Sequence, residues 1–111
     1  ERIVIAGDLF PNPQNESFFV NGDIEKLFGR KIIDLFSQAD YCLCNVEGAL
    51  SDSGDTCRKT GPVKVASSRS VNAYKALGID LCLLANNHVT DGGSRGVIDT
   101  IEIEEHTSEL Q

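Results

Sequence analysis

The chain lacks methionine and tryptophan, and it has no long apolar run. No segment approaches the roughly 20 apolar residues that a membrane-crossing helix needs, so we expect no membrane span in these residues. Glu1 and Arg2 lead directly into an apolar run, without a signal-peptide pattern. Because methionine is absent, we expect an initiator, alone or with a targeting segment, to belong ahead of Glu1. The chain as given favours the cytoplasm; the alternative is the cell surface, with an anchor outside this sequence.

Positive charge is scarce. The 111 residues include 10 Lys and Arg against 17 Asp and Glu, which gives a formal net charge of -7. Nucleic acids and anionic membrane surfaces bind clustered Lys and Arg, so the sequence argues against either as the main partner. The hydrophobic content of 41% is that of an ordinary globular protein. We therefore expect one folded domain over 1–111 whose acidic groups suit cations.

The four cysteines form no CxxC pair. Three of them, Cys42, Cys44 and Cys82, lie inside short apolar runs, and the fourth is Cys57. Buried, reduced thiols are the interpretation that this placement favours. A disulfide or a soft-metal site would need a spatial coincidence that the sequence does not indicate.

Apolar periodicity and turn residues predict an alternation of strands and helices. We expect strands at 2–6, 41–44 and 80–85, with the last buried between layers. Loops are expected at 10–22 and 48–61, a brief extended piece at 63–66, and helices at 24–36, 70–77 and from about 94 onward. This order predicts an α/β fold of mainly parallel strands with right-handed crossover helices.

Each of the three expected strands ends in polar residues: Asp8 after the first, Asn45 and Glu47 after the second, and Asn86, Asn87 and His88 after the third. The carboxyl ends of parallel strands share one edge of a sheet, where α/β proteins bind ligands. Carboxylate, amide and imidazole groups suit Mg, Mn, Fe or Zn in a hydrolytic site. Taken singly, each group also fits a turn, a cap or a solvated position.

Four of the ten basic residues, Arg58, Lys59, Lys64 and Arg69, fall in one twelve-residue segment that follows the second strand. Two interpretations are open. Lys59 and Lys64 either border the site and attract an anionic substrate, or belong to a solvated surface loop.

Three stretches resemble successive motifs of one family: Gly7-Asp8, NVEGALSDSG at 45–54, and ALGIDLCLLANNHVTDGGSRGVIDT at 76–100. They are similar to those of the bacterial capsule-synthesis protein CapA family, also called poly-gamma-glutamate synthesis proteins. That family is similar in fold to the calcineurin-like metallophosphoesterases, in which an α/β/β/α sandwich holds two metals at its strand ends. The resemblance extends from Arg2 to about Thr100.

The resemblance implies a role for each matching residue. Asp8 and Glu47 correspond to metal-binding carboxylates, and Asn87 to a metal-binding amide. His88 corresponds to the histidine that protonates the leaving group, and is the expected catalytic residue. The implied cofactors are divalent metal ions of the Mn, Fe, Zn or Mg type.

Four further residues have supporting roles in this expectation. Asn45 and Asn86 would support the site or face the substrate, and Lys59 and Lys64 would bind it. The substrate is expected to be an anionic small molecule or polymer. The function implied is hydrolysis of a phosphoester or related bond in capsule or polyglutamate synthesis; the alternative is a non-catalytic scaffold or anion-binding subunit of a capsule assembly complex.

The sequence departs from the metallophosphoesterase pattern in two ways. No Asp-x-His motif occurs at Asp8, and late histidine motifs are missing, because the only other histidine is His106 in an acidic tail. We therefore expect the amino-terminal half of the sandwich. A half-sandwich predicts an uncovered sheet face and an unpaired edge, and hence association of the chain with itself or with another segment.

Overall fold

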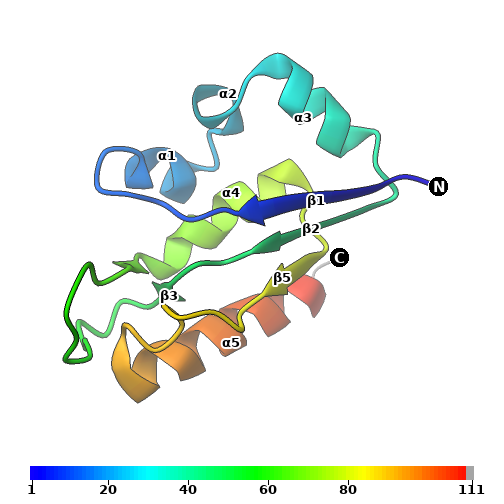
Figure 1. Ribbon diagram of the computed structural model, residues 1–111. Helices are drawn as coiled ribbons and strands as arrows, with labels where there is room; N and C mark the ends of the chain where they lie inside the picture. Colours follow the sequence, from blue (N-terminus) through cyan, green and yellow to red (C-terminus); the bar gives the residue numbers. More distant parts are fainter. Residues whose placement is uncertain (110–111) are drawn as a thin grey trace.

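The computed structural model describes residues 1–109; within the last helix, nothing is described of the side chains of 104 and 106–109, so that of His106 lies outside the described part. The elements are arranged as an α/β protein (Figure 1). In chain order they are β1 (Ile3–Asp8), α1 (Glu16–Asn21), α2 (Ile24–Leu27), α3 (Arg30–Ser37), β2 (Tyr41–Asn45), β3 (Ala49–Leu50), β4 (Val65–Ala66), η1 (Ser68–Ser70), α4 (Val71–Leu77), β5 (Leu81–Leu83) and α5 (Gly93–Glu109).

The main sheet has three parallel strands in the order β1-β2-β5. Ile3 is in register with Tyr41, and Leu43 with Leu81. The three arrows run in the same direction in Figure 1, so their carboxyl ends share one edge. A second sheet consists of the short parallel pair β3 and β4. The predicted parallel α/β fold is confirmed.

The core lies between the main sheet and the helices. Cys42 and Cys44 of β2 are buried and pack with Phe19 of α1, Phe36 of α3 and Tyr74 of α4. Alternate residues of a strand face opposite sides of a sheet, so these two cysteines share the helix-covered face. All four cysteines are free thiols, and no described helix is long and apolar enough to cross a membrane.

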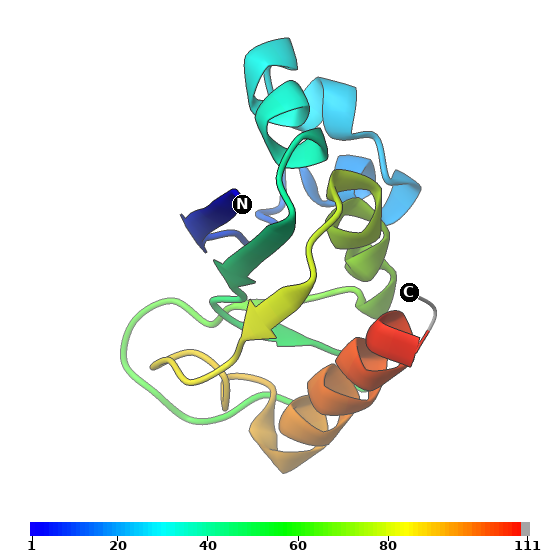
Figure 2. The ribbon, with the colours of Figure 1, turned by 90° about the vertical axis from the view of Figure 1, so that its right-hand side faces the viewer.

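The opposite face of the main sheet is exposed. Its apolar residues alternate with the buried ones, and Ile5 of β1 and Leu83 of β5 expose 70% and 46% of their surface. Figure 2 shows the helices above and to one side of the strands, with no helix of residues 1–109 on the other side. The predicted uncovered face is confirmed, whereas the prediction that 80–85 is a buried strand is wrong because only one of its faces is covered.

Two helix boundaries differ from the prediction. The expected loop 10–22 contains α1, because Asn12 and Asn15 exchange side-chain hydrogen bonds with each other's N–H groups and start a helix whose Phe19 is buried. The expected helix 24–36 is divided into α2 and α3. Phe28 adopts an extended conformation and Gly29 forms the N-cap of α3, so this glycine separates two helices instead of lying within one.

Candidate functional site

Three amide and carboxylate side chains form a chain of hydrogen bonds across the strand ends. The Asn45 Nδ2 group donates to Asp8 Oδ1 at 2.6 Å, and the Asn86 Nδ2 group donates to Asn45 Oδ1 at 3.1 Å. The hydrogen bond from Asn45 lowers the pKa of Asp8, with a smaller contribution from Glu47. The strand ends therefore meet at one edge of the sheet, as the sequence predicts.

The side chain of His88 is fixed in the turn that follows β5. Asn86 Oδ1 accepts the backbone N–H of His88 at 2.9 Å, which holds the turn closed. The imidazole is buried, with Nδ1 2.7 Å from Asp91 Oδ2 and Nε2 3.7 Å from Glu47 Oε1. The predicted catalytic histidine thus lies beside one of the predicted acidic ligands.

Lys59 and Lys64 reach the same cluster from the long segment between β3 and β4. The Lys64 Nζ group donates to Glu47 Oε1 at 2.9 Å. The Lys59 Nζ group lies 2.9 Å from Asp91 Oδ1 and 3.2 Å from His88 Nδ1. Both lysines therefore border the site, while the segment that carries them is largely exposed, so the two interpretations of this segment stay predictions.

Asp91 is the residue of the site to which sequence reasoning gave no role. Its side chain is 1% exposed, and Oδ2 accepts the backbone N–H of Lys64 at 2.7 Å in addition to its contact with His88. Burial alone would raise the pKa of this carboxyl, but the hydrogen bonds from Lys64, His88 and Lys59 outweigh it and lower the pKa. The signal for Asp91 was its position three residues after His88 in the D-x-G motif.

Asn87, the predicted amide ligand, is exposed in the turn between Asn86 and His88. Among the described residues, no group of three or more His, Cys, Asp or Glu side chains is placed to hold one metal ion. The carboxylates of Glu47 and Asp91 are instead neutralised by Lys64 and Lys59. The donor types match those that a hard divalent cation prefers, and in this structure the two carboxylates are paired with lysines.

A pocket of about 610 Å³ opens beside Lys64. Its walls come from the segment after β1 and from the segment that leads into β4, and they include Phe10, Pro11, Pro62 and Val63. The pocket therefore combines largely apolar walls with two residues of opposite charge, Lys64 and Glu16.

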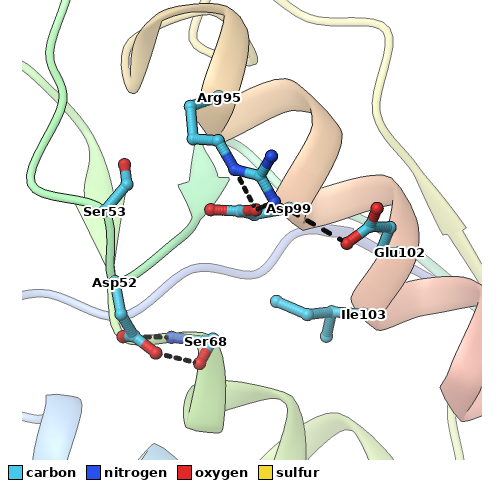
Figure 3. Close-up of a pocket in the computed structure, with 7 residues that line it drawn as sticks. All are labelled: Asp52, Ser53, Ser68, Arg95, Asp99, Glu102 and Ile103. Carbon is cyan, nitrogen blue, oxygen red and sulfur yellow. Dashed lines mark hydrogen bonds and ion pairs between the residues drawn. The ribbon is translucent and has the colours of Figure 1, made fainter.

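Gly96, Asp99 and Thr100, which end the third stretch of the family resemblance at 76–100, have a structural role. Figure 3 shows Asp99 paired with Arg95 among the residues that line a second pocket, which also include Glu102 of α5. Asp99 also accepts the Ser51 hydroxyl at 2.5 Å, and Thr100 Oγ1 accepts the N–H of Leu50 at 2.9 Å. These contacts attach α5 to β3 and keep the following loop in place.

The fold and this edge define an α/β protein with a polar site at the carboxyl ends of a parallel sheet. The family model described as "Bacterial capsule synthesis protein PGA_cap" matches residues 2–108. The chain belongs to this family, and the resemblance in its motifs is confirmed.

Two curated relatives are probable polyglutamine synthesis accessory proteins of Mycobacterium tuberculosis, from strains CDC 1551 / Oshkosh and ATCC 25618 / H37Rv. Each is 34% identical to this chain over 62 residues. The match covers 56% of this chain and 16% of each relative, so most of the relatives' length lies outside it. The family and these names relate the chain to capsule and polyglutamine synthesis.

Proposed function

We propose that this chain provides the site for an anionic substrate in the synthesis of a capsule polymer of the polyglutamate type. The observation that supports this most is the convergence of Lys59, Lys64 and His88 at the carboxyl edge of the sheet. Each ammonium group is paired with a carboxylate, and the N–H donors that Lys64 does not use on Glu47 can bind a carboxylate or phosphate group. The pocket next to Lys64 leaves room for the part of the substrate that carries this group.

Charge removal tests this function. In Lys59→Gln and Lys64→Gln, we expect inorganic phosphate and a short γ-linked glutamate oligomer to bind about tenfold more weakly, because one charge-assisted hydrogen bond is lost. Isothermal titration calorimetry measures the change. Lys31→Gln is the matched control, since it removes the same charge from the exposed surface of α3. Equal binding in all three variants and wild type would refute the proposal.

Hydrolysis of a phosphoester or related bond with a divalent metal ion is a second candidate function. The observation in its favour is that Glu47 Oε1 and His88 Nε2 lie 3.7 Å apart and are both metal-ligand atoms. Lys64 already forms an ion pair with this carboxylate, so a cation would have to displace its ammonium group. Metal binding and the Lys64 ion pair are therefore expected to compete.

The competition provides a sharp test of the metal proposal. Removing the ammonium in Lys64→Met should tighten Mn²⁺ binding about tenfold or more, since the ion would no longer displace a charged partner. Titration with Mn²⁺, metal content after purification and cleavage of a generic phosphodiester are the measurements. If neither protein binds Mn, Fe, Zn or Mg and neither cleaves the ester, a scaffold or anion-binding subunit is the better description.

A further inference from the structure

The imidazole of His88 lies beside groups of opposite charge, two carboxylates and one ammonium group. Nδ1 lies 2.7 Å from the Asp91 carboxylate and 3.2 Å from the Lys59 ammonium, while Nε2 faces Glu47 at 3.7 Å. In a neutral ring, one nitrogen carries the proton and donates, and the other accepts. Nδ1 therefore either donates to Asp91 or accepts from Lys59. The choice decides which ring nitrogen is left without a proton and can act as an acceptor.

The surroundings of Asp91 favour donation from Nδ1. An ionised carboxylate is an acceptor only, and Oδ2 of Asp91 already points at Nδ1. A bare Nδ1 would place its lone pair 2.7 Å from this oxygen, in a buried position where solvent does not screen the repulsion. Lys59 has an alternative acceptor in Asp91 Oδ1 at 2.9 Å, so it does not need Nδ1.

We propose that Asp91 is the positioning residue of the site: it accepts the Nδ1 proton of His88 and leaves Nε2 as the bare acceptor that faces Glu47. A neutral His88 in this form takes a proton from water, a hydroxyl or an amine, or binds a cation. It does not donate from Nε2, which is the role that the family resemblance implies. The use of this acceptor in a reaction rests on the proposed function, whereas the tautomer itself does not.

The tautomer can be measured directly. A His106→Gln background leaves one imidazole, and long-range ¹H–¹⁵N spectra of the metal-free protein at about pH 9 report which ring nitrogen is protonated in a neutral histidine. We expect the Nδ1–H form to exceed the Nε2–H form about tenfold or more, because a charge-assisted hydrogen bond holds it. A predominance of the Nε2–H form would overturn the assignment.

Two variants separate the contributions of the two neighbours. Lys59→Met removes the competing donor, so we expect the Nδ1–H form to persist. Asp91→Asn replaces the ionised acceptor with a neutral amide, whose oxygen can accept from Nδ1 in one orientation and whose N–H₂ group donates to Nδ1 in the other, so we expect the Nδ1–H preference to weaken. Asp52→Asn is the control, because it changes a carboxylate whose partner is Ser68 and should leave the ring as in wild type.

If Asp91→Asn does not fold, the tautomer measured in wild type and in Lys59→Met still tests the proposal. Reversal of the tautomer in Lys59→Met would show that Lys59 sets the ring, and the proposal would fail. Phosphate titrated into the same samples tests the proposed function separately. An Nδ1–H ring without phosphate binding would uphold the role of Asp91 and reject anion binding. Phosphate binding with an Nε2–H ring would uphold anion binding and reject the role of Asp91.

Discussion

Asp91 joins its own turn after β5 to a segment far away in the chain, the one that carries Lys59 and Lys64. Its two oxygens meet the ammonium of Lys59, the backbone N–H of Lys64 and the ring of His88. A buried carboxylate is tolerated only when its acceptor sites are satisfied, so these contacts depend on one another. The positions of Lys59, Lys64 and His88 are thus linked through this one buried carboxylate.

The network of Asp91 makes stability fall in acid. Although burial would raise its pKa, its hydrogen bonds hold the pKa in the folded state below the ordinary value of an aspartate. The folded protein therefore binds fewer protons than the unfolded chain in this range, and the stabilisation is present above about pH 4 and lost as the pH falls further. Thermal melts followed by circular dichroism from pH 7 to pH 2.5 should show this decline.

Asp91→Asn should be less stable than wild type at pH 7, by about 1–3 kcal/mol, and its melting temperature should decline less steeply in acid. The exposed Asp55→Asn serves as the control and should follow the wild-type curve. Parallel curves for wild type and Asp91→Asn would show that this carboxylate does not contribute to the acid response.

Thr100 offers a second prediction for a single residue. Its buried hydroxyl accepts the N–H of Leu50 and donates to the carbonyl of Gly96 at 2.6 Å. Thr100→Val keeps the shape but leaves the Leu50 N–H unsatisfied, which should lower the free energy of unfolding by about 1–3 kcal/mol. Urea denaturation measures it. The exposed Thr60→Val should change stability by less than about 0.5 kcal/mol, and a similar loss in both variants would contradict this explanation.

At the scale of the elements, the sequence predicted the parallel strands and the edge where Asp8, Asn45 and His88 meet. Periodicity and strand-end polarity are local signals, and the topology of parallel strands converts them into a shared edge. Asp91 was missed because a carboxylate next to glycines resembles an ordinary turn residue until its long-range partners are known. The break at Gly29 was missed because helical spacing continues on both sides of it.

The junction between β2 and β3 depends on Gly48. A Cβ atom at this position would lie 2.5 Å from Phe10 Cζ and 2.7 Å from the carbonyl oxygen of Lys64. Gly48→Ala should therefore force the two neighbouring segments apart and destabilise the protein by about 1–3 kcal/mol. The same displacement should weaken phosphate binding at Lys64.

Gly29→Ala is the matched control for that substitution. No atom lies within 4 Å of its added Cβ, and its φ of -69° suits alanine. We expect a change of less than about 0.5 kcal/mol, because alanine restricts the unfolded chain but is a poorer N-cap residue than glycine. Equal losses in both glycine variants, measured by urea denaturation, would show that the close contact at Gly48 is not the cause.

At the scale of the whole molecule, the main sheet leaves one apolar face exposed to solvent. Ile3 and Ile5 of β1 and Leu81 and Leu83 of β5 expose between 42% and 70% of their surface. Contiguous apolar surface of this kind marks an interaction site. We therefore expect this chain, when alone, to associate with itself through this face.

Charged substitutions on the open face test the association. Ile5→Lys and Leu83→Lys should shift the chain toward a monomer in sedimentation velocity at micromolar concentrations, with little loss of stability, because both side chains are already exposed. Ile101→Lys, at an exposed apolar position on α5, is the matched control and should leave the association unchanged. A stable wild-type monomer would contradict the expectation.

The large sequence separation between paired strands of the main sheet also affects the folding rate. Paired residues of the main sheet lie 37 or 38 positions apart, as in Asp8 with Asn45 and Leu43 with Leu81, and no hairpin joins its strands. The chain must close large loops before any strand pair forms, and this entropic cost slows folding relative to helical proteins of similar size. During that delay the apolar strands stay unpaired, so nascent chains should aggregate more readily than the folded protein does.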